Sequence, residues 1–473
     1  MRVSAVGHRS LEPTGDDLRA LLAEAVEYVV GVVDRLPAAP VSDTEGVAEF
    51  LADPALRRPP PAHGRPLAEL LAVLDHAATK GLNPSSPGLM AFIPGSGIVA
   101  AAIADLLADV LNRYTAEAFP APGLVALEAD VLRWLADLFD LPAGAAGMLT
   151  SGGSMAMLSA VVTARHARLG DDVAAGTLYT SDQAHHSVAK SARLAGFPAD
   201  AVRVVPVDAD LRLDPAALAA AVAADRAAGR RPFCVVATAG TTNTGTVDPL
   251  PALADLAAAD GLWLHVDAAY GGFFQLTERG RERMRGIERA DSLVLDPHKG
   301  LFLPFGTGGL LVRDGDLLRA AHTGRAADSG PAADYLQDIE DVGLPSFADY
   351  GPEFTRDFRG LRLWLPLHLH GVDAFRAALD EKLDLAEYAH DELAADPHVT
   401  VLGRPELSTV VFRHERDTPE LLRRVNAEQR VYLSSTRLGG RHVGRICVLN
   451  HRTDRARVAA AVEAIRRHAA EIR

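Results

Sequence analysis

The sequence predicts an α/β protein built on a mostly parallel β-sheet with helices on both faces. Between residues 145 and 312, short apolar runs alternate with Ala-rich segments of helical character. The runs are continuously apolar rather than alternating, which is typical of strands buried on both faces of a parallel sheet. They are TLYT (177–180), VRVVPV (202–207), FCVVAT (233–238), LWLHVD (262–267), SLVLD (292–296) and GGLLVR (308–313).

The chain outside this region divides into three further parts. Residues 1–75 form an expected N-terminal helical segment, with helical spacing at 16–35 and 67–78 around a Pro-rich connector. Residues 76–325 form the expected large domain. Residues 326–357 are polar and interrupted by glycine and proline, which indicates a long mobile loop. Residues 358–473 form an expected small α/β domain, with a helical pattern at 358–395, strands STVVFR and RICVLN, and a final helix at 454–471.

Composition and charge exclude several classes of protein. A net charge of −14 argues against a nucleic-acid partner, because nucleic-acid phosphates require a basic face. The N-terminus has no apolar core of signal-peptide length, and no apolar run is long enough for a membrane span. Cys234 and Cys447 both lie in apolar runs, where buried reduced thiols are expected. These features predict a cytoplasmic protein.

Polar residues follow the predicted strands at the edge where parallel sheets bind ligands. Ser151, Gly152, Gly153 and Ser154 come between an apolar run and a helix, a pattern that forms either a phosphate cradle or a simple Gly-rich cap. Asp267 ends the run LWLHVD, where it is either a satisfied structural carboxylate or the partner of a cationic ligand group.

A histidine pair and a rare lysine complete the set. His185 follows a predicted strand in SDQAHHS, in either a structural or a functional role. Lys299 ends DSLVLDPHK, and the chain has three other lysines. Of these, Lys80 precedes a turn glycine, and Lys190 and Lys382 are expected on the polar faces of helices. A partly buried amine loses its proton easily and becomes a nucleophile toward an aldehyde.

One ligand accounts for all four features. Pyridoxal phosphate needs amide donors for its phosphate, a lysine for its aldehyde and an acidic partner for its pyridine nitrogen. No HExxH, paired CxxC, Walker or GxSxG motif is present, so no metal site is expected.

With these motifs in place, the chain resembles the group II pyridoxal-phosphate-dependent amino acid decarboxylases, which include aromatic amino acid, tyrosine and glutamate decarboxylases. The resemblance covers roughly residues 65 to 465 and depends on five motifs in order: TSGGS, SDQAHHS, TAGTTNTGTVDP, HVDAAYGG and DPHKG. It implies the fold-type I architecture of the aspartate aminotransferase-like enzymes, with a seven-stranded, mostly parallel sheet and a small C-terminal α/β domain. It also implies a homodimer with active sites at the subunit interface.

The resemblance assigns a role to each matching residue. It implies that Lys299 is the Schiff-base lysine, that Asp267 keeps the pyridine nitrogen protonated and that His185 stacks on the cofactor ring. The other expected cofactor-binding residues are Gly153, Ser154, Asp296 and His298 around the phosphate, and Thr242 and Ala269 along the ring. Tyr335, in the loop, matches a tyrosine that protonates the substrate carbon. Arg445 matches an arginine that meets the substrate carboxylate in some members.

The substrate pocket departs from the family pattern more than the cofactor motifs do. Phe92, Ile93 and Pro94 are expected to wall the pocket, and Gly300 stands where a tryptophan is common. The expected reaction is decarboxylation of an L-amino acid, with an aromatic or apolar side chain favoured. Two alternatives stay open: an aldehyde synthase or another pyridoxal-phosphate lyase or aminotransferase, and a non-catalytic binding protein. Tyr335 argues against the aldehyde synthase, and Lys299 against the binding protein.

Overall fold

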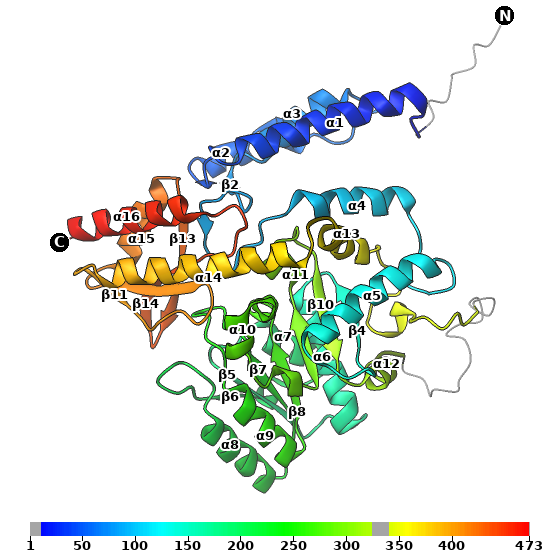
Figure 1. Ribbon diagram of the computed structural model, residues 1–473, viewed down its shortest axis with the longest axis vertical. Helices are drawn as coiled ribbons and strands as arrows, with labels where there is room; N and C mark the ends of the chain where they lie inside the picture. The colour runs from blue at the N-terminus through cyan, green and yellow to red at the C-terminus, as the bar shows by residue number, and fades with distance from the viewer. Residues whose placement is uncertain (1–10, 324–339, 473) are drawn as a thin grey trace, which may run out of the picture.

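A seven-stranded sheet forms the centre of the protein in a computed structural model that describes residues 11–323 and 340–472 (Figure 1). Its pairings are parallel except those of one strand, β10, which is antiparallel to both neighbours. In spatial order the strands are β4 (Ala146–Thr150), β10 (Gly308–Val312), β9 (Ser292–Leu295), β8 (Trp263–Asp267), β7 (Arg231–Thr238), β5 (Gly176–Ser181) and β6 (Val202–Val205). The predicted α/β sheet is therefore confirmed.

Helices cover both faces of this sheet and bury its strands. Strands β8 and β9 are buried at every position, which explains why their sequences are continuously apolar. The packing helices are α5 (Pro122–Leu138), α6 (Gly153–Leu169), α7 (Ser187–Leu194), α8 (Pro215–Ala227), α9 (Leu250–Asp260), α10 (Glu278–Arg283) and α12 (Gly315–Thr323). Lys299 lies in the short helix α11 (Pro297–Gly300), directly after β9.

A second, five-stranded sheet has its own hydrophobic core. Its order is β11 (Val399–Val401), β12 (Thr409–His414), β14 (Arg441–Cys447), β13 (Tyr432–Leu438) and β3 (Leu89–Met90). Helices α14 (Val372–Ala394), α15 (Thr418–Ala427) and α16 (Arg455–Glu471) pack on it. Strand β3 comes from early in the chain and pairs parallel with β13, so the segment that follows it starts at this sheet.

The N-terminal helices lie apart from both sheets. Helices α1 (Gly15–Arg35) and α3 (Leu67–Ala77) contact each other and form an elongated layer with the short α2 (Val47–Leu51) (Figure 1). Neither α1 nor α3 has a buried residue. Helix α4 (Val99–Leu111) packs on α13 (Gly360–His370), which also contacts α5. In residues 11–323 and 340–472 no helix has the length and apolarity needed to cross a membrane.

One expectation about the lysines is wrong. Lys382 is fully buried in α14, whereas Lys190 is exposed as expected. The Lys382 ammonium donates to the carbonyl of Thr453 at 2.6 Å and to the Glu381 carboxylate at 2.7 Å, and burial lowers its pKa. These partners come from the far end of the chain and from an adjacent side chain, so helical spacing did not reveal them. Both cysteines are free and buried, as predicted.

Candidate active site

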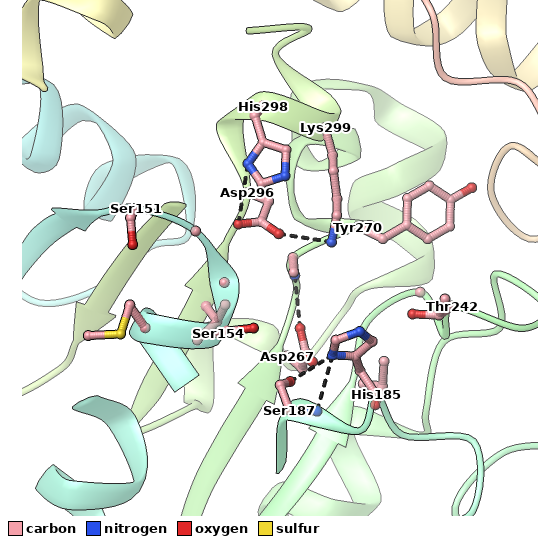
Figure 2. A pocket seen from close by; sticks show the side chains of 17 residues that line it. Ser151, Ser154, His185, Ser187, Thr242, Asp267, Tyr270, Asp296, His298 and Lys299 are labelled. Carbon is pink, nitrogen blue, oxygen red and sulfur yellow. Dashed lines mark hydrogen bonds and ion pairs between the residues drawn. The ribbon is translucent and has the colours of Figure 1, made fainter. Parts of the chain in front are cut away.

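A cavity of about 270 Å³ opens at the carboxyl ends of the parallel strands (Figure 2). Strands β7, β8 and β9 and the start of helix α6 meet there, as the topology of such sheets requires. The cavity is lined by Ser151, Gly152, Gly153, Ser154, Met155, His185, Ser187, Thr238, Gly240, Thr242, Asp267, Ala269, Tyr270, Val294, Asp296, His298 and Lys299.

Lys299 projects into this cavity from the turn that ends β9 (Figure 2). Asp296 caps α11, Pro297 occupies its first position, and the Lys299 N–H donates to the Asp296 carbonyl at 2.8 Å. The same turn brings the Lys299 Nζ to 2.8 Å from Asp296 Oδ2. The other carboxylate oxygen, Oδ1, has no hydrogen-bond partner among the described residues. The lysine therefore has a nearby counter-ion, and its side chain reaches the cavity.

Asp267 lies at the end of β8, inside the cavity wall. It is 6% exposed, and burial raises the pKa of its carboxyl group. The positive charge of Lys299 and the Ala269 N–H, which donates to Asp267 Oδ1 at 3.1 Å, act in the opposite direction. A carboxylate held in this position favours a cationic group in the cavity, because the cation would offset the cost of burying the negative charge.

His185 faces the cavity as a neutral imidazole. Burial, together with the nearby charges of His186 and Lys299, lowers its pKa to about 4. Its Nδ1 accepts the Ser187 N–H at 3.3 Å and lies 2.8 Å from the Ser187 hydroxyl. Because Nδ1 is an acceptor, the ring proton is on Nε2. Such a ring is uncharged and held in place, so it can lie flat against an aromatic ligand.

Glycines open the cavity beside helix α6. Gly152 has φ +152°, and a Cβ on Gly153 would lie 2.9 Å from Asp296 Oδ2. Helix α6 begins at Gly153 without a side-chain cap, so its first N–H groups are available to a ligand. His298 lies on the other side of Asp296 and donates from Nδ1 to the Thr307 carbonyl at 2.6 Å. A free helix N-terminus beside small residues suits an anion such as a phosphate.

The structure brings together most of the residues singled out from the sequence. All nine expected cofactor-binding residues line the cavity, from Gly153 to Lys299. Phe92 and Ile93 do not line it, and Tyr335 lies outside the described residues. Six lining residues were missed: Met155, Ser187, Thr238, Gly240, Tyr270 and Val294. They belong to or adjoin the motifs and predicted strand ends, so the strand-end rule applied to every strand would have found them.

Arg445 also lies outside the cavity lining. Its side chain is buried and donates to the backbone carbonyls of Phe92, Thr242 and Asn243 and to the Ser434 hydroxyl. In the structure Arg445 therefore binds backbone carbonyls and a hydroxyl, and its contact with a substrate carboxylate stays a prediction. At Gly300 the space of a side chain is already filled, because a Cβ there would lie 2.6 Å from the Cβ of Phe273.

A model of the pyridoxal-dependent decarboxylase conserved domain matches residues 61–415. The chain belongs to the pyridoxal-dependent decarboxylases. An aromatic-L-amino-acid decarboxylase of Bacillus atrophaeus is 34% identical to it over 458 residues, 94% of either chain. Tryptophan decarboxylase 1 of Oryza sativa subsp. japonica is 32% identical over 499 residues, covering 97% of this chain and 94% of the relative.

Solved structures of this decarboxylase's relatives have the same fold. The crystal structure of Oryza sativa TDC with PLP and tryptamine matches with a TM-score of 0.90 at 29% identity, over 98% of this chain and 99% of that one. Rhodiola rosea 4-hydroxyphenylacetaldehyde synthase matches with a TM-score of 0.88 at 25% identity, over 97% and 99%. The fold-type I prediction is thus confirmed, and this decarboxylase is a lyase that uses pyridoxal phosphate to decarboxylate an amino acid.

The cavity fits that cofactor on three counts. The uncapped start of α6 offers N–H groups to a phosphate, and at Gly153 it is packed so close to Asp296 that a side chain would not fit. The buried carboxyl of Asp267 calls for a cationic partner, which a protonated pyridine nitrogen is. The Lys299 amine reaches the same cavity, where it can meet the aldehyde of the cofactor (Figure 2).

Proposed function

We propose that this decarboxylase converts an aromatic L-amino acid into the corresponding amine and carbon dioxide. The convergence of Lys299, Asp267 and the free α6 N-terminus on one cavity supports the chemistry. Several relatives named for aromatic substrates support the side chain, among them tyrosine decarboxylase 2 of Arabidopsis thaliana, 31% identical over 452 residues. An L-2,4-diaminobutyrate decarboxylase of Rhizobium meliloti is 36% identical, over 390 residues, so the substrate class needs a direct test.

The residue roles follow from position and charge. Lys299 would hold the cofactor covalently through its Nζ. Asp267 would keep a proton on the pyridine nitrogen, and pyridoxal phosphate, when bound, would supply an electron sink for the bond to the carboxyl carbon. His185 would stack against the ring. The residues that would hold the phosphate are Gly153, Ser154, Asp296 and His298, and those that would line the ring are Thr242 and Ala269.

The charges of the cavity favour an uncharged substrate side chain. No arginine lines the cavity in the described part of the chain, and its cationic candidates are Lys299 and two histidines, one of which burial keeps neutral. A glutamate side chain would therefore lack a dedicated cation. The lining carboxylates are Asp267 and Asp296, assigned above to the cofactor site, so a second substrate amine would lack a dedicated anion. The predicted role of Phe92 and Ile93 in substrate binding stays a proposal, since neither residue lines the cavity.

Tyr335 completes the proposed reaction. Its hydroxyl delivers a proton to the carbon that has lost carbon dioxide, and the product is then an amine. The Tyr335→Phe variant should still bind the cofactor but divert product from amine toward a carbonyl compound. Assaying amine and aldehyde in the same reaction measures this partition; an unchanged amine yield would remove Tyr335 from the mechanism and reopen the aldehyde-synthase alternative.

We also propose that the enzyme works as a cytoplasmic homodimer with active sites at the subunit interface. The apolar side chains left exposed on α1 and α4 support an assembly. Leu106 and Val110 of α4 are 52% and 76% exposed, and six leucine and valine side chains of α1 are exposed as well. Clusters of exposed apolar side chains often mark a protein–protein interface.

A substrate screen tests the proposal. The purified holoenzyme is offered the twenty amino acids together with 2,4-diaminobutyrate, and carbon dioxide, amine and aldehyde are all measured. Tryptophan, tyrosine or phenylalanine should give the highest kcat/KM, with amine as product. A clear preference for glutamate or diaminobutyrate would overturn the aromatic assignment while leaving the decarboxylase intact.

A further inference from the structure

Arg445 lies behind the cavity wall, on a hairpin of the C-terminal sheet. We propose that Arg445 is a positioning residue: its guanidinium fixes the Phe92 segment and the Thr242 loop relative to each other and so sets the affinity for substrate, without contacting the substrate carboxylate. This inference deepens the proposed function and depends on it only for the choice of substrate.

The hairpin presents Arg445 and Ser434 as a cross-strand pair of β14 and β13. The Arg445 Nε donates to the Asn243 carbonyl at 2.8 Å and Nη1 to the Ser434 hydroxyl at 3.0 Å. Nη2 donates to the carbonyls of Thr242 and, at 3.1 Å, Phe92. One side chain thus joins two segments separated by about 150 residues, and Thr242 is itself a lining residue of the cavity.

Ser434 strengthens the hold on Phe92. Its hydroxyl accepts the Phe92 N–H at 2.9 Å, so the N–H and the carbonyl of Phe92 are both bound by this hairpin. Phe92 has φ +57°, a left-handed conformation that a residue with a side chain rarely adopts. Such a conformation persists when its surroundings enforce it, and here the enforcing groups are Ser434 and Arg445.

The same hairpin reaches the turn of His185. The Thr436 hydroxyl donates to the Asn243 side-chain oxygen at 2.7 Å, and the Asn243 amide donates to Gln183 Oε1 at 3.0 Å. Gln183 precedes His185 by two residues. Movement of the hairpin would therefore shift two lining residues of the cavity, Thr242 and His185.

The bonding of the guanidinium distinguishes positioning from carboxylate binding. Arginine has five N–H groups, and four of those of Arg445 are engaged by the acceptors above. The residue is 3% exposed. A carboxylate would have to displace buried carbonyls that accept no other hydrogen bond among the described residues, which is costly.

The test compares an aromatic amino acid with its product amine, because the two ligands differ by the carboxylate alone. Arg445→Lys keeps the charge but loses the planar fork. We expect its KM for the amino acid and its dissociation constant for the amine, measured from the absorbance change of the bound cofactor, to rise together by about tenfold. We expect kcat to change less. A higher KM for the amino acid with an unchanged dissociation constant for the amine would overturn the proposal and make Arg445 a carboxylate ligand.

Two further variants complete the experiment. Ser434→Ala removes one acceptor of Arg445 and the acceptor of the Phe92 N–H. It should weaken the binding of both ligands about threefold with cofactor content unchanged, and it should lower the melting temperature slightly because two buried donors lose their acceptor. Unchanged affinities in this variant would overturn the proposal, and it decides the matter if Arg445→Lys does not fold. Arg441→Lys, on the exposed end of β14, is the matched control and should behave as the wild type. Absence of amine from any aromatic amino acid with the wild type would instead refute the proposed function, and the comparison would then use the accepted acid and its amine.

Discussion

At the scale of single residues, the site depends on groups whose protonation is changed by burial. Asp267 is buried with one N–H donor, so its charge depends on a cationic partner. His185 is kept neutral because burial lowers its pKa to about 4. Lys299 keeps a carboxylate at 2.8 Å. A carboxylate, an uncharged ring and an amine around one cavity match the three parts of a pyridoxal ring that a protein must address.

Replacing Asp267 by Asn tests the first of these groups. The amide has nearly the size of the carboxylate but cannot stabilise a proton on the pyridine nitrogen. We expect the variant to bind the cofactor and to lose about a hundredfold or more in kcat, the scale of a removed charge-stabilising group. Single-turnover kinetics with measured cofactor content would check this; a kcat within threefold of wild type would contradict the assignment.

Replacing Lys299 by Ala removes the anchor. We expect decarboxylation to fall by about a thousandfold or more and the visible absorbance of the covalently bound cofactor to disappear, because no other lysine lines the described cavity. Lys190→Ala, on the exposed face of α7, is the control and should keep both. Retention of the yellow colour in the Lys299 variant would show that another group forms the bond.

At the scale of elements, the junction between β4 and α6 forms the anion site. Gly152 and Gly153 let the helix begin beside Asp296, and the helix has no side-chain cap. A Cβ at Gly153 would crowd the Asp296 carboxylate, since it would lie 2.9 Å from Oδ2. The sequence motif TSGGS therefore has a steric reason in this fold, in addition to the flexibility of glycine.

Gly153→Ala tests the steric part of this reason. The new Cβ would lie 2.9 Å from Asp296 Oδ2, and we expect the affinity for pyridoxal phosphate to fall at least about tenfold while the chain stays folded. Gly123→Ala is the matched control, since Gly123 also lies in the first turn of a helix and its added Cβ would meet nothing within 4 Å. Equal cofactor affinity in both variants would exclude a close approach at Gly153.

Strand β8 contains a histidine that makes stability depend on pH. His265 is fully buried, its Nδ1 lies 2.8 Å from the Ser292 hydroxyl, and burial lowers its pKa to about 3. Between pH 6.5 and pH 3 the unfolded chain binds a proton at this residue that the folded chain does not. Its contribution to stability is therefore complete above pH 6.5 and is lost as the pH falls.

His265→Asn should flatten the acid side of the stability profile. The free energy of unfolding of the wild type should fall with decreasing pH more steeply than that of the variant, by about 1.4 kcal/mol per pH unit between pH 6 and pH 4. Urea unfolding at several pH values measures both slopes. Equal slopes would mean that His265 is protonated in the folded chain.

At the scale of the whole molecule, the described chain has two main cores and an outlying helical layer. The chain crosses between the two sheets through β3, and the Tyr270 hydroxyl of the cavity wall contacts the Ser408 and Thr409 hydroxyls at 2.9 and 3.0 Å. The N-terminal layer and α4 leave apolar side chains exposed. A second copy of the chain is the proposed partner for that surface.

Val110→Asp tests the assembly. Val110 is 76% exposed on α4, so a charge there should not disturb the folded subunit but should weaken an apolar interface by tenfold or more, about 1.4 kcal/mol. Sedimentation of the wild type should give a dimer, and the variant should shift toward monomer. Val204→Asp, at a 63% exposed position of the edge strand β6, should leave the dimer unchanged. A wild-type monomer would refute the homodimer.

The sequence alone determined the sheet, the cofactor motifs and most of the lining residues, because these depend on local patterns. A short apolar run followed by Asp267, or by Asp296 and Lys299, places these side chains at the ligand-binding edge of the sheet. This holds whichever strand they follow, because the parallel strands end at one edge. The tertiary structure decided the positions whose partners are distant in sequence. Buried Lys382 donates a hydrogen bond to the Thr453 carbonyl, and Arg445 donates to carbonyls of residues 92, 242 and 243. Such contacts leave no periodic signal in the chain, because tertiary packing brings the partners together.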